Sequence, residues 1–79
     1  MSADLETRVI AVIAETFGAD PAAIGRDTTA DDVDGWDSLS HTILMMRLER
    51  ALGVGIDEAT AGGAANVGEL IDALEALGA

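Results

Sequence analysis

Apolar residues recur at intervals of three and four positions along the first part of the chain. They are Leu5, Val9, Val12, Ile13 and Phe17. This spacing places them on one face of an amphipathic helix, and Gly18 follows as a residue that tolerates the backbone conformation common at helix ends. We therefore predict a first helix over residues 5–17.

The next segment is poor in apolar residues. Asp20 and Pro21 are typical of a cap followed by a proline at the first helical position, so one short turn should precede Gly25. Residues 25–37 are rich in Thr, Asp and Gly, and we expect a loop there and no further element. Connections of this length usually have a function.

Residues 38–52 contain no Gly or Pro and are rich in Leu, Met, Arg and Glu, which form helices well. Asp37 is a suitable N-cap, and Gly53 follows the last residue. A second helix over Ser38–Leu52 is therefore predicted.

This second helix carries two apolar stripes when its residues are placed about 100° apart. One stripe contains Leu44, Met45, Leu48 and Leu52, and the other contains Leu39, Ile43 and Met46. We expect the first stripe to pack against the first and last helices. The second should lie partly at the surface beside Ser38, as a candidate docking surface flanked by Arg47 and Arg50. Alternatively, both stripes are buried and the short third helix covers the second.

Two shorter elements complete the pattern. Residues 57–61 could form a brief third helix that Gly62 and Gly63 stop. Asn66 and Glu69 have the spacing of a capping box for a last helix, which Gly78 ends. Its apolar stripe consists of Leu70, Ile71, Leu74 and Leu77. The predicted fold is all-α: a small bundle of three main helices and one short helix, with a long loop between the first two, in one domain over residues 1–79.

The net charge of the chain disfavours some classes of binding partner. Four basic residues against fifteen acidic ones give a net charge of -11, which disfavours nucleic acid and anionic lipid surfaces as partners. The same acidic charge suits binding to basic surfaces of partner proteins, although a surface that is acidic only for solubility would have the same composition.

The chain has no Cys, so any thiol chemistry needs an added group. The start of the chain shows no signal pattern, and no run approaches roughly 20 apolar residues. We expect a cytoplasmic monomer without membrane contact.

The segment Gly35-Trp36-Asp37-Ser38-Leu39 resembles the attachment motif of acyl carrier proteins, in which Asp-Ser-Leu opens the second helix. The order and lengths of the predicted helices are also similar to that family. The resemblance implies that Ser38 takes a covalent 4'-phosphopantetheine arm from coenzyme A through a phosphopantetheinyl transferase. It also implies a non-catalytic carrier whose partners are acyl- or aminoacyl-loading and condensing enzymes.

The position of Ser38 at a predicted helix N-terminus also favours a negatively charged modification. A phosphodiester on Ser38 would lie in the first turn of a helix, where backbone N–H groups and the helix dipole favour negative charge. The candidate motif and docking residues are Asp37, Leu39, His41, Ile43, Met46 and Arg47.

The second helix departs from many fatty acid carriers, because Glu49 is its only acid. It looks more like the discrete carriers of polyketide or nonribosomal peptide pathways. Asp-Ser-Leu, in place of the glycine-histidine-serine pattern frequent in peptidyl carriers, favours an acyl cargo over an aminoacyl one.

Two other functions have some support in the sequence. Ser38 and His41 share a helical face, as in a serine hydrolase, but so short a chain has little material for a pocket and an oxyanion hole. His41 is instead expected to be a neutral surface histidine that contacts the arm, a partner or water. An unmodified interaction domain that uses the Leu39, Ile43 and Met46 stripe is the other alternative.

The remaining candidates concern a metal and the single tryptophan. Counting a calcium loop from Gly35 as its sixth position puts Ala30 at position one and His41 at position twelve, where Asp and Glu are needed. No dedicated metal site is therefore predicted. Trp36 is expected to pack the long loop onto the bundle, and a recognition role is its alternative.

Overall fold

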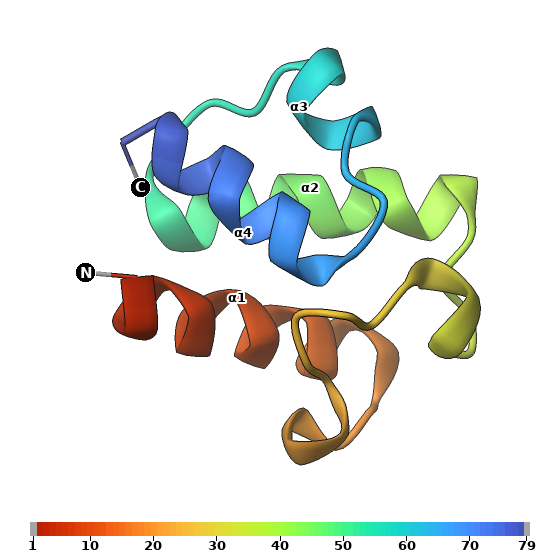
Figure 1. Ribbon diagram of the computed structural model, residues 1–79. Coiled ribbons are helices and arrows are strands. Elements are labelled where there is room, and N and C mark those ends of the chain that lie inside the picture. The colour runs from red at the N-terminus through yellow and green to blue at the C-terminus, as the bar shows by residue number, and fades with distance from the viewer. Residues whose placement is uncertain (1, 79) are drawn as a thin grey trace.

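The computed structural model describes residues 2–78, which form four α-helices and two short 3-10 turns and contain no strand (Figure 1). The helices are α1 (Ser2–Phe17), α2 (Ser38–Leu52), α3 (Glu58–Gly62) and α4 (Val67–Ala76), and the 3-10 turns are Pro21–Ala23 and Ala30–Asp32. The all-α prediction, with three longer helices and one short helix, is confirmed.

Helix α2 runs antiparallel to α1, and α4 packs across α1 while α3 contacts α4 (Figure 1). The core is formed where α1, α2 and α4 meet. It contains Leu5, Val9, Ile13, Ala14, Ile24, Leu44, Met45, Leu48, Val67, Leu70, Ile71 and Leu74. Within the described residues, none of the helices is long and apolar enough to cross a membrane.

The two apolar stripes of α2 have different environments, as the helical spacing predicted. Leu44 and Leu48 are fully buried. The second stripe is at the surface, with exposed fractions of 75% for Leu39, 44% for Ile43 and 61% for Met46. The alternative in which both stripes are buried and α3 covers the second is therefore wrong.

The loop between α1 and α2 is more ordered than the sequence suggested. Residues Ala30–Asp32 form a 3-10 turn in the segment predicted to be loop alone. The Asp32 carboxylate accepts hydrogen bonds from the Thr29 backbone N–H (2.9 Å) and hydroxyl (3.1 Å), a local bond that competes with extended conformations. Val33, which follows, is buried.

Arg26 holds the start of this loop against α1 and α4. Its guanidinium pairs with Glu6 (2.9 Å) and with Asp72 (2.7 Å). The backbone reinforces this contact, because the Gly68 N–H donates to the Arg26 carbonyl at 2.7 Å. A Cβ at position 68 would come within 2.9 Å of that carbonyl oxygen, so glycine permits the close approach.

Two predictions about helix N-termini differ from the structure. Helix α1 begins at Ser2 and not at Leu5. At α4, the Asn66 side chain caps the Glu69 N–H (2.9 Å), but the Glu69 carboxylate accepts from the Ala65 N–H (3.2 Å) and not from Asn66. The predicted capping box is thus only half formed.

Candidate functional site

Asp37 begins α2 with a reciprocal cap. Its Oδ1 accepts a hydrogen bond from the Ser40 backbone N–H at 3.0 Å, and the Asp37 N–H donates to Ser40 Oγ at 2.8 Å. The Ser40 hydroxyl also donates to the Gly35 carbonyl at 2.6 Å. The predicted N-cap is confirmed, and the sequence analysis missed Ser40, although its position three residues after Asp37 is the capping-box spacing.

The cap also governs the charge of Asp37. The Ser40 backbone N–H, and then its hydroxyl, lower the pKa of the Asp37 carboxyl below its ordinary value. A carboxyl with a lowered pKa in the folded state stabilises the protein above its unfolded pKa. That contribution is lost as the pH falls through the lowered pKa, so the cap is intact at neutral pH.

Ser38 is the first residue of α2, and its side chain is exposed. Its hydroxyl forms no hydrogen bond with any other part of residues 2–78, whereas the hydroxyl of Ser40 is committed to the cap. Of the two serines at this helix start, Ser38 is therefore the one whose oxygen is free to react.

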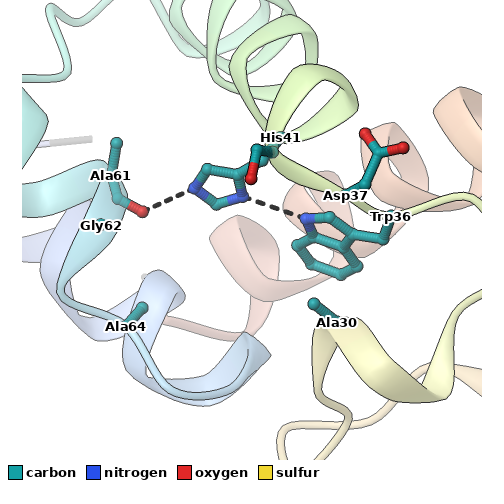
Figure 2. A pocket seen from close by; sticks show the side chains of 8 residues that line it. Ala30, Trp36, Asp37, His41, Ala61, Gly62 and Ala64 are labelled. Atoms are coloured by element: carbon teal, nitrogen blue, oxygen red, sulfur yellow. Dashed lines mark hydrogen bonds between the residues drawn. The ribbon is translucent and has the colours of Figure 1, made fainter.

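An open groove of about 440 Å³ lies between the start of α2 and α3 (Figure 2), and Ser38 is one of the residues that line it. Small residues line most of this groove, and aromatic rings close one end of it. The lining consists of Ala30, Trp36, Asp37, Ser38, His41, Ala61, Gly62 and Ala64. The groove and the exposed Ser38 side chain are therefore adjacent.

Trp36 packs the loop onto the bundle, as predicted. Its ring stacks on that of Phe17, with centroids 5.2 Å apart and planes inclined by 21°. Its Nε1–H donates to His41 Nδ1 at 3.0 Å, and His41 Nε2 lies 2.7 Å from the Ala61 carbonyl oxygen (Figure 2). Because an indole N–H can only donate and a carbonyl can only accept, the imidazole is neutral with its proton on Nε2.

The expectation that His41 is a surface histidine is therefore wrong. The residue is half-buried, and its two ring nitrogens link the loop to α3. The pattern of residues could not show this, because the Ala61 carbonyl is twenty positions away. Neither nitrogen is free to activate Ser38, so the geometry does not support the hydrolase interpretation.

His41 should accordingly control the order of α3, which buries no residue of its own. We expect His41→Ala to raise amide hydrogen exchange in residues 58–62 strongly while α1 and α4 keep their protection. The loss of two partly buried hydrogen bonds should cost about 1–3 kcal/mol. Thr42→Ala, a change at the exposed neighbour, is the matched control. Unchanged exchange in α3 would show that other contacts hold this helix.

The other candidate docking residues lie on one exposed side of α2. Leu39, Ile43 and Met46 form the exposed stripe, and Arg47 is exposed next to it. Asp37 is exposed at its start. His41 is directed away from this stripe toward α3, so the structure brings it together with Asp37 at the groove and not with the exposed stripe.

The residues that line the groove beside Ser38 are mostly small, with Trp36, Asp37 and His41 among them. Within residues 2–78, no group of three or more His, Cys, Asp or Glu side chains could hold a metal. The distinguishing features of Ser38 are its free, exposed hydroxyl and its place in the lining of the groove.

A comparison with protein families gives an independent result. The family model described as "Phosphopantetheine attachment site" matches residues 7–74. The matched region runs from α1 into α4 and includes Ser38, the Asp37 cap and every residue that lines the groove.

Proposed function

The chain belongs to the phosphopantetheine attachment family, and on that premise we propose that it is a carrier protein with Ser38 as its attachment residue. Domains of this family are the site of covalent 4'-phosphopantetheine attachment, and they work with phosphopantetheinyl transferases and biosynthetic enzymes. The bound arm supplies a thiol, which the chain's own side chains cannot do because it has no Cys.

The observation that carries the proposal is the free, exposed hydroxyl of Ser38 beside the groove. In the attachment step, Ser38 Oγ forms a bond to phosphorus and the pyrophosphate of coenzyme A is cleaved. The adenosine bisphosphate leaves, and the hydroxyl proton passes to solvent. The resulting negative phosphodiester lies in the first turn of α2, where the helix dipole favours it.

The carrier itself is proposed to be non-catalytic, with acyl groups held as thioesters on the arm. Docking is assigned to Leu39, Ile43, Met46 and Arg47, together with Asp37, while His41 positions α3. Support for a specialised polyketide or nonribosomal peptide pathway comes from the scarcity of acid on α2. Its single acid, Glu49, has its carboxylate bound to the Ile56 N–H at 2.7 Å. We favour an acyl cargo over an aminoacyl one on the Asp-Ser-Leu motif.

The test is the intact mass of the protein after incubation with a broad-specificity phosphopantetheinyl transferase, magnesium and coenzyme A. We expect a gain of one phosphopantetheine per chain. A thiol reagent should then titrate one thiol per chain against a blank of zero, since the unmodified chain has no Cys. A folded chain that gains no mass with several transferases would contradict the proposal and favour an unmodified interaction domain.

A further inference from the structure

A second groove, of about 240 Å³, lies between α1 and α2 on the side of α2 away from α3. It is lined by Val12, Glu15, Arg47, Arg50 and Ala51. Arg8 adjoins it, because its guanidinium donates to the Ala51 carbonyl at 2.7 Å. We call this the arginine groove, and it gathers three of the four basic residues of a chain whose net charge is -11.

Arg47 and Arg50 are not used to hold the fold together. Arg26, the basic residue outside the groove, pairs with both Glu6 and Asp72. In contrast, neither Arg47 nor Arg50 forms an ion pair with any acid in residues 2–78, although the chain has fifteen acids. Glu15, which shares the groove, is not paired with them either. Two exposed guanidinium groups are therefore available to an external carboxylate.

The arginine groove is continuous with the exposed stripe of α2. Arg47 follows Ile43 by four positions and Arg50 follows Met46 by four, so each arginine lies next to an apolar member of the stripe on the helix surface. Arg47 lies nine residues beyond Ser38, which corresponds to about 14 Å along the helix. One continuous surface thus leads from the attachment residue to the arginines.

We propose that the arginine groove docks an acidic segment of a partner enzyme, with its carboxylates on Arg47 and Arg50 and its apolar residues on Ile43 and Met46. A guanidinium binds a carboxylate through two parallel hydrogen bonds, which fixes the orientation as well as the position. The negative charge over the rest of the molecule repels an acidic partner, so only this surface admits it. The inference rests on the carrier function in one respect: the docked partner acts on the arm at Ser38.

The test uses two synthetic amphipathic peptides of equal length, one with Leu and Glu on one face and one with Leu and Lys there. Each is titrated into the isotopically labelled full chain and followed by NMR, including the arginine side-chain resonances. We expect the acidic peptide to shift Val12, Arg47, Arg50 and Ala51. The basic peptide should leave these signals unchanged.

Three variants test whether peptide binding depends on the charges in the arginine groove. Replacing both Arg47 and Arg50 with Gln should weaken binding of the acidic peptide roughly fivefold to thirtyfold, since each exposed ion pair contributes up to a factor of about five. Glu15→Gln should strengthen binding, an effect that misfolding cannot imitate. The double variant Ala22→Asp, Ala59→Asp changes the net charge as much as the arginine pair does, at exposed sites outside the groove, and should bind as the native chain does.

Three outcomes would overturn the inference: shifts that map elsewhere, equal weakening by the alanine-to-aspartate control, or the same groove shifts with inorganic phosphate alone at the peptide concentration. The last outcome would identify a simple anion site. The peptide titration needs no arm, so it is independent of the mass measurement. Failure of attachment at Ser38 and failure of docking at Arg47 and Arg50 are therefore distinguishable.

Discussion

Ser38→Ala is expected to abolish attachment of phosphopantetheine while the helical bundle stays folded. The substitution removes the one hydroxyl at the start of α2 that forms no bond within residues 2–78, so no nucleophile remains for the transferase. Alanine is a better helix former than serine and the side chain is exposed, so stability should change by no more than about 0.5 kcal/mol. Intact mass after the transferase reaction, with circular dichroism of the same sample, measures both results.

Ser40→Ala is the matched control for this experiment, because it changes the same residue type two positions away. The Ser40 hydroxyl accepts from the Asp37 N–H and donates to the Gly35 carbonyl. Its loss should cost about 0.5–1.5 kcal/mol and leave attachment in place. If the Ser38 variant gained the arm, or if the Ser40 variant alone failed to, the assignment of Ser38 would be wrong.

Leu44→Ala should destabilise the protein far more than Met46→Ala, although the two residues are two positions apart on α2. Leu44 is fully buried in the core, whereas 61% of Met46 is exposed. Truncation of a buried leucine costs about 2–5 kcal/mol, against a total stability for a chain of this size of roughly 4–12 kcal/mol. Met46→Ala should stay within about 0.5 kcal/mol. Urea unfolding followed by circular dichroism gives both differences.

Comparing Leu44→Ala with Met46→Ala also distinguishes an effect on stability from an effect on docking. Met46→Ala should weaken the binding of the acidic peptide while its unfolding midpoint stays close to that of the native chain. Equal destabilisation by the two substitutions would mean that the exposed stripe of α2 is buried in solution, for example against a second copy of the chain. The docking surface proposed for α2 would then be occupied already.

Helical periodicity was enough to predict most of the fold. The sequence alone distinguished the two stripes of α2, because their residues occupy different angles around the helix axis. Leu44 is buried and Leu39 is exposed, as those angles predict. Asp37 and Asn66 were predictable as caps because a cap depends on residues within three positions. The place of Ser38 as the first residue of α2 was predictable because a suitable cap precedes it and no Gly or Pro follows until Gly53.

Contacts between distant positions were not predictable in this way. The surface assignment of His41 was wrong because the carbonyl that holds the ring belongs to Ala61, and no spacing rule connects the two residues. The groove beside Ser38 was not predicted for a related reason, since its lining comes from three segments of the chain and half of it is alanine and glycine, which give no sequence signal of a site. The arginine groove also depends on α1 and α2 lying antiparallel, which brings Arg8 to the end of α2.

The stacking of Trp36 on Phe17 beside the attachment residue has a spectroscopic consequence. The chain contains one tryptophan and no tyrosine, so its fluorescence on excitation at the red edge of the absorption band comes entirely from an indole in the wall of the groove next to Ser38. That indole is also hydrogen-bonded to His41, which lines the same groove. The protein therefore carries a native optical probe at its functional site, and events there can be followed without attaching a dye.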